Sequence, residues 1–167
     1  KICFKNYIGN DDDSYINRTV RDIMVWQDYL YVVLINYEIK KNQCFASTII
    51  LKGKINLTEN KILFSKFFST DSHIDISNEN FDPLHAGGVL IVKNNQIILA
   101  YPDFGIYKNS QIESNPFGKI INISEGNKYD IISIGHRNPQ GLYYDIESEE
   151  IISTEHGPTG GDEINLI

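Results

Sequence analysis

The stretch GHRNPQGLYYDIESEEIISTEHGPTGGDEINLI, residues 135–167, alternates short apolar runs with two loops rich in glycine, proline and polar side chains. The runs Gly141–Tyr144 and Ile151–Thr154 have the length and composition of β-strands, and Glu163–Ile167 begins another. The stretch therefore predicts strands joined by loops that hold polar side chains at defined positions.

Strand patterns of the same kind recur through the rest of the chain. The first set comprises Asp22–Trp26, Leu30–Asn36, Ala46–Leu51 and Ile62–Phe68. The second set comprises Gly88–Val92, Ile97–Tyr101, Gly118–Ile123 and Ile131–Ile134. Asn94-Asn95 lies between two apolar runs and predicts a hairpin, because Asn tolerates a positive φ. No window has the apolar spacing of a long helix, so the sequence predicts an all-β chain, either propeller blades or a sandwich.

The composition bounds the class of protein. A length of 167 residues fits a single domain, residues 1–167, and an apolar content of 41% fits a packed core. The net charge of −7 argues against nucleic acid as a partner, because phosphate binding needs a basic face. Cys3 and Cys44 could form one disulfide or remain two thiols. No apolar run reaches the ~20 residues of a membrane span, and no signal-peptide pattern opens the chain.

The first polar cluster is Gly135–Leu142. Arg137 offers a rigid fork of donors suited to carboxylates, and Asn138 adds a neutral donor and acceptor. Pro139 and Gly141 predict a turn that holds both side chains between two strands. The cluster suits an anionic planar ligand; the alternative is a structural turn whose arginine pairs with a nearby carboxylate.

The second cluster, Glu155–Glu163, follows the strand Ile151–Thr154. Carbonyl oxygens in its Gly157-Pro158 turn are ligands of the kind that Ca²⁺ prefers. A transition metal at His156 is disfavoured, because no second His or Cys lies at ligand spacing. The alternative is a glycine-rich loop whose acidic side chains bond local amides.

The third cluster is Asp82–Gly88. His85 directly precedes a predicted strand, and a histidine there can act as a general base near neutral pH. The alternative is a histidine with a packing role or on the surface. The two following glycines, Gly87 and Gly88, let another group approach the backbone closely.

Together these clusters resemble the soluble PQQ-dependent glucose and aldose sugar (glucose/sorbosone) dehydrogenase family, where PQQ is pyrroloquinoline quinone. HAGG, FGKI, GHRNPQG and EHGP occur here in the order that the family has. The resemblance covers about residues 85–167. It implies part of a six-bladed β-propeller, with approximate blades at 20–68, 86–134 and 141–167, the last unfinished.

The resemblance also implies roles. His85 would take the proton of a sugar's anomeric hydroxyl as a hydride passes to the quinone. Arg137 and Asn138 would bind PQQ, and the carbonyl oxygens of Gly157 and Pro158 would hold Ca²⁺. An aldose and an external electron acceptor would be the partners, in the periplasm or outside the cell.

The sequence departs from the family in two respects. Val89 stands where relatives carry a polar residue after HAGG, and the Gly-Asp-Gly-like turn is reduced to Pro102-Asp103-Phe104-Gly105. The chain also stops within the apolar segment Leu166-Ile167, so we expect a fragment. Its open sheet edges predict self-association. The alternatives to an enzyme are a non-catalytic propeller that binds carbohydrate or protein, and a structural domain whose site has decayed.

Overall fold

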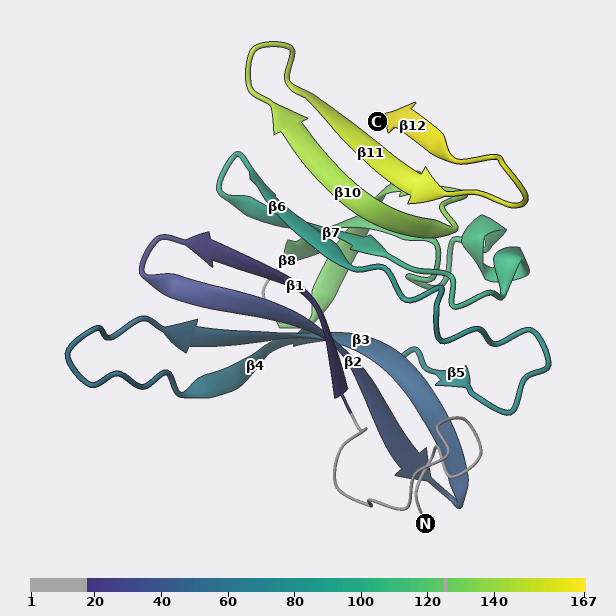
Figure 1. Ribbon diagram of the computed structural model, residues 1–167, viewed down its shortest axis with the longest axis horizontal. Helices are drawn as coiled ribbons and strands as arrows, with labels where there is room; N and C mark the ends of the chain where they lie inside the picture. The colour runs from purple at the N-terminus through teal and green to yellow at the C-terminus, as the bar shows by residue number, and fades with distance from the viewer. Residues whose placement is uncertain (1–17, 125) are drawn as a thin grey trace.

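The computed structural model describes residues 18–124 and 126–167, and this part of the chain forms three antiparallel sheets (Figure 1). The first sheet contains β1 (Arg18–Trp26), β2 (Tyr29–Lys40), β3 (Gln43–Lys54) and β4 (Phe64–Ser69), with β5 (Ile74–Asp75) beside β3. The second contains β6 (Val89–Lys93), β7 (Gln96–Tyr101), β8 (Lys119–Ser124) and β9 (Lys128–Ile134). The third contains β10 (Asn138–Asp145), β11 (Glu150–His156) and β12 (Glu163–Leu166).

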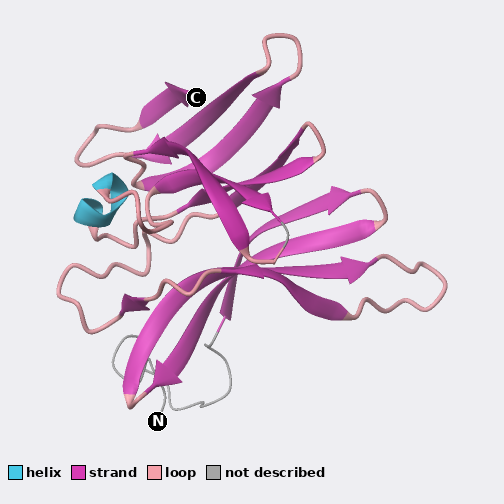
Figure 2. Ribbon diagram, turned by 180° about the vertical axis from the view of Figure 1, so that it is seen from behind, coloured by secondary structure: helices cyan, strands magenta, loops and turns pink. Residues whose placement is uncertain are grey.

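The first strand of each sheet lies next to the first strand of the neighbouring sheet. β1 contacts β6 and β6 contacts β10, while the later strands spread outward (Figures 1 and 2). The carboxylate of Asp22 in β1 accepts the N–H of Leu90 in β6 at 2.8 Å. The chain is therefore all-β, with its sheets arranged radially as in part of a β-propeller. We propose that each sheet is one blade.

Apolar side chains fill the spaces between the sheets. The larger core lies between the first and second sheets and includes the fully buried Tyr31, Phe68, Leu99 and Ile121. A smaller core around Ile98, Ile120 and Ile151 joins the second sheet to the third. These cores fix the sheets relative to one another, and so fix the loops at their ends.

The predicted strands are present, and several are longer than expected; β2 and β3 each extend over 12 residues. Asn94 and Asn95 have φ values of 50° and 62° and form the tight β6–β7 turn, as predicted. The turn expected at Pro139 and Gly141 is wrong. Both residues lie in β10, where the pairing with β11 shifts between them, so a bulge replaces the turn.

Two short elements were not predicted. β5 contributes two residues beside β3, and a 3₁₀ helix, η1 (Tyr107–Gln111), connects β7 to β8 (Figure 2). Both are too short to produce a periodic sequence pattern. No helix in residues 18–124 and 126–167 is long and apolar enough to cross a membrane. Cys3 lies outside the described residues, so the structure does not test whether it pairs with Cys44.

Candidate active site

Three segments that are distant in the sequence meet at one end of the second and third sheets. They are the loop of residues 82–88, the turn of residues 102–106 and the first residues of β10. The side chain of Asn138 joins two of them, because its Oδ1 accepts the N–H of Gly87 at 3.1 Å and its Nδ2 donates to the carbonyl of Leu84 at 3.3 Å. The N–H of Asp103 donates to the carbonyl of Arg137 at 3.0 Å.

Gly87 is required for this meeting. A Cβ at this position would lie 2.0 Å from the carbonyl oxygen of Pro139, far inside van der Waals contact. The loop that carries His85 can therefore reach β10 only with glycine at residue 87. This close approach explains why the first glycine of the HAGG motif, Gly87, cannot carry a side chain.

His85 lies between two carboxylates. Its Nε2 is 3.5 Å from Asp82 Oδ2, and its Nδ1 is 3.7 Å from Asp103 Oδ1. The side chain is 17% exposed, yet Nδ1 is buried and has no hydrogen-bond partner within the described residues. The ring is thus partly accessible and has a carboxylate on each side.

Asp103 is the buried member of this group, with its side chain 1% exposed. Burial raises the pKa of its carboxyl group, and the N–H of Gly105 and the charges of His85 and Arg137 offset part of that rise. Gly105 donates to Asp103 Oδ1 at 2.7 Å, which fixes the carboxylate toward the histidine. The sequence marked this residue only as part of a reduced family turn, because its proximity to His85 depends on the packing of β6 against β7.

Arg137 connects the first cluster to the second. Its Nη1 donates to the carbonyl oxygens of His156 at 3.1 Å and Gly157 at 2.8 Å. The carbonyl of Pro158 accepts the N–H of Gly161 at 2.9 Å. Gly157 and Pro158, expected to hold a cation, therefore lie beside the arginine expected to hold an anion.

The amide of Asn138 is largely occupied by protein groups. Besides the contacts to Gly87 and Leu84, its Oδ1 accepts a hydrogen bond from Gln140 Nε2 at 2.8 Å. Asn138 is buried, and one N–H of its amide makes no hydrogen bond within the described residues. The sequence could not indicate the contacts to Gly87 and Leu84, because these residues lie 51 and 54 positions earlier in the chain.

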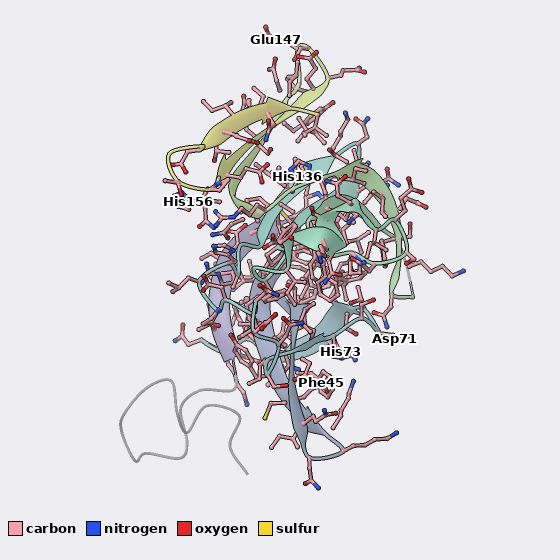
Figure 3. All side chains as sticks on the ribbon, turned by 90° about the vertical axis from the view of Figure 1, so that its right-hand side faces the viewer. Phe45, Asp71, His73, His136, Glu147 and His156 are labelled. Atoms are coloured by element: carbon pink, nitrogen blue, oxygen red, sulfur yellow. The ribbon has the colours of Figure 1, made fainter. Side chains whose placement is uncertain are left out.

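A buried pair that the sequence analysis did not single out supports Arg137. Glu155, with its side chain 3% exposed, accepts hydrogen bonds from His136 Nδ1 at 2.8 Å and from the N–H of Arg137 at 2.7 Å. Asn165 donates to the same carboxylate at 2.8 Å, and His136 Nε2 lies 2.8 Å from Ser133 Oγ. Figure 3 shows His136 within the body of the molecule and His156 toward its margin.

The charge of Glu155 is stabilised by this network. Burial alone would raise the pKa of Glu155, but the hydrogen bonds from His136, the N–H of Arg137 and Asn165 outweigh burial and lower it. The carboxylate is therefore ionised near neutral pH. In the sequence, His136 lies in the first polar cluster and Glu155 in the second, and nothing in either cluster indicates that the two side chains pair.

The candidate cation ligands are the backbone carbonyl oxygens of Gly157 and Pro158. No group of three or more His, Cys, Asp or Glu side chains is placed to hold a metal in residues 18–124 and 126–167. A cation at Gly157 and Pro158 would use the second lone pairs of carbonyls that already accept one hydrogen bond each.

The chain is similar in sequence to an aldose sugar dehydrogenase and to an uncharacterized protein. The aldose sugar dehydrogenase YliI of Escherichia coli is 44% identical over 54 residues, 32% of this chain and 14% of that protein. An uncharacterized protein of Synechocystis is 37% identical over 76 residues, 37% of this chain and 18% of that protein.

Two solved structures share the fold. A glucose dehydrogenase superposes with a TM-score of 0.71 at 21% identity, covering 89% of this chain and 50% of that one. The soluble aldose sugar dehydrogenase of Escherichia coli, in its apo form, gives a TM-score of 0.64 at 23% identity, covering 83% of this chain and 42% of that one. This chain thus spans half or less of each of these two structures.

The sequence model of one family, described as Glucose / Sorbosone dehydrogenase, matches residues 21–167. This match includes all three sheets except the first residues of β1, and it contains each of the three clusters described above. The chain therefore belongs to the Glucose / Sorbosone dehydrogenase family.

Proposed function

We propose that this chain supplies the general base and some of the cofactor-binding residues of a sugar dehydrogenase that uses PQQ and Ca²⁺. Its substrate is an aldose, oxidised at the anomeric hydroxyl, and an external acceptor takes the electrons. The observation that carries the proposal is the position of His85. It is partly exposed, flanked by Asp82 and Asp103, and held at the same end of the sheets as Arg137.

His85 is the proposed general base. A neutral imidazole nitrogen can accept the proton of the anomeric hydroxyl, which makes removal of the hydride from the same carbon easier. The buried Asp103 faces the other side of the ring and stabilises the imidazolium that forms. The contact between Asn138 and Gly87 holds the loop of His85 in position during this step.

The chain has donors that fit the quinone. PQQ is a planar carboxylate-bearing molecule, and Arg137 keeps Nε and Nη2 donors beyond the Nη1 group that bonds the carbonyls of His156 and Gly157. Asn138 contributes one further N–H. When bound, PQQ supplies the two-electron chemistry that no side chain provides.

The oxygen atoms of Gly157 and Pro158 fit Ca²⁺ in chemical type, since the ion prefers hard oxygen ligands and takes 6–8 of them. Two carbonyls supply a minority of that number, so the proposed site needs the cofactor and water as further ligands. A bound Ca²⁺ would draw electron density from the quinone and favour hydride acceptance. We propose export to the periplasm or the cell exterior, as the family resemblance implies.

Reconstitution tests the proposed activity. The purified protein is incubated with PQQ and CaCl₂, and an aldose and a redox dye are then added. We expect dye reduction that depends on PQQ, on Ca²⁺ and on the aldose. A folded protein that binds PQQ but reduces no dye with a panel of aldoses would contradict the enzyme and favour a non-catalytic binding propeller.

The outer edge of the third sheet supports a second proposal, that copies of this chain associate. β12 pairs with β11 alone among the described strands, and its Ile164 and Leu166 are 79% and 64% exposed. We expect light scattering to show a mass that rises with protein concentration. Ile164→Lys should shift the distribution toward monomer, whereas a stable monomer at high concentration would contradict self-association.

A further inference from the structure

A groove lies between the first and second sheets, at the end opposite the candidate active site. It is bordered by the β1–β2 turn at Gln27 and the β6–β7 turn at Asn95, and has a volume of about 430 Å³. Both hairpins lie on the left of Figure 1, and the loop of residues 76–88 lies on the right. The groove is therefore separate from the site of His85.

Aromatic rings form one wall of this groove. The rings of Trp26 and Tyr31 are 6.1 Å apart between centroids, and those of Tyr31 and Phe67 are 5.2 Å apart in an edge-to-face arrangement. Trp26 and Phe67 are only partly buried, so part of their ring surface faces the groove. Such rings bind the apolar C–H faces of ligands that also carry polar groups.

Lys52 places a positive charge on two of these rings, Tyr31 and Phe67, and on the neighbouring Tyr29. Its Nζ lies 4.0 Å from the ring centroid of Tyr29, 5.4 Å from that of Tyr31 and 5.5 Å from that of Phe67. Within residues 18–124 and 126–167, no carboxylate forms an ion pair with Lys52, and Nζ donates no hydrogen bond. Among the described residues, the groove thus contains a cation held on aromatic rings and without an acidic partner, in a chain of net charge −7.

Three amide side chains also line the groove, those of Gln27, Asn95 and Gln96, beside Ile97, Ile123 and Ser124. None of them makes a side-chain hydrogen bond to another part of the described structure. Amides can donate to and accept from hydroxyl groups at the same time. The groove therefore combines an apolar wall, several neutral hydrogen-bonding groups and one cation.

We propose that this groove binds an acidic sugar, a uronate unit of an oligosaccharide. The sugar's C–H face packs on Trp26 and Phe67, its hydroxyl groups meet the amides of Gln27 and Gln96, and its carboxylate pairs with Lys52. A neutral sugar would leave Lys52 unpaired, and an aromatic acid would leave the amides without hydroxyl partners. The inference is independent of the proposed dehydrogenase activity.

Trp26 gives a direct measurement, because it is the one tryptophan in the sequence. The purified protein is titrated with digalacturonate, with a neutral disaccharide and with benzoate, and tryptophan fluorescence is followed. We expect a saturable change with digalacturonate that weakens as NaCl is added, and at least tenfold weaker binding of the other two. An equal response to benzoate or to the neutral disaccharide would overturn the proposed ligand.

Lys52→Met keeps much of the apolar stem and removes the charge. We expect it to weaken digalacturonate binding about tenfold, the effect of losing one charged hydrogen-bonded contact. The matched control is Lys66→Met, a lysine on β4 that does not line the groove, which should bind like the unchanged protein. With circular dichroism confirming that both variants fold, undiminished binding by Lys52→Met would overturn the proposal, as would an absent response in the unchanged protein.

Discussion

His85→Ala is expected to lower the rate of dye reduction by about 100- to 10,000-fold, the contribution of a positioned general base. PQQ binding should change little, because His85 makes no contact with Arg137 or Asn138 among the interactions described above. The measurement is steady-state dye reduction with the reconstituted protein, together with the absorbance of bound PQQ. Loss of dye reduction with retained PQQ binding would identify His85 as the base.

Asp103→Asn gives a graded companion to this experiment. It keeps the size of the side chain but removes the charge that faces His85, so we expect a smaller loss of rate than in His85→Ala. The matched control is His73→Ala, because His73 contacts Glu38 and Lys40 in the first sheet and makes no described contact with the candidate site. A His85→Ala variant with an unchanged rate would remove His85 from the role of base.

Glu155→Ala is expected to lower the free energy of unfolding by about 3 kcal/mol, as is typical when one partner of a buried charged pair is removed. The substitution leaves His136 Nδ1, the N–H of Arg137 and Asn165 without their common acceptor. Urea denaturation followed by circular dichroism measures this change. Glu150→Ala, an exposed glutamate at the start of the same strand, should change stability by less than about 0.5 kcal/mol.

The same carboxylate makes stability depend on pH. The pKa of Glu155 is lower in the folded chain than its ordinary value of 4.5, so the unfolded chain binds its proton more readily. Its stabilising contribution is complete above about pH 4.5 and is lost as the pH falls toward the lowered folded value. Unfolding free energies between pH 6 and pH 3 should therefore decline less steeply in Glu155→Ala. Parallel curves for the two proteins would contradict an ionised Glu155.

Much of the fold could be predicted from the sequence, because strands such as β7 and β8 are short apolar runs bounded by turn residues. The Asn94-Asn95 turn is equally local, since its geometry depends on the φ preferences of two residues. The bulge at Pro139 and Gly141 was not predictable, because it results from pairing with β11. Short apolar runs and turn residues were thus enough to predict the strands and the Asn94-Asn95 turn, which depend on neighbouring residues in the sequence.

The sequence predicted individual residues of the candidate site, but not how they are arranged in space. The sequence indicated His85, Arg137 and Gly157 separately, through the chemistry of their side chains and carbonyls. It could not indicate that Arg137 Nη1 bonds the Gly157 carbonyl, or that Asp103 lies beside His85. The pairing of β10 with β11 brings Arg137 to Gly157, and the pairing of β6 with β7 brings Asp103 to His85.

The hydrogen bonds from Asn138 to Gly87 and Leu84 have a consequence for recombining this protein with its relatives. The loop that carries His85 precedes the second sheet, but its position is determined by the first residue of the third. If the second sheet and the loop of residues 82–88 came from a relative, that loop would have to bind the β10 of this chain. Chimaeras should therefore retain function when residues 82–167 are exchanged as one unit, because this unit also keeps β10 with β11 and Arg137 with Glu155, and crossovers between β9 and β10 should be damaging.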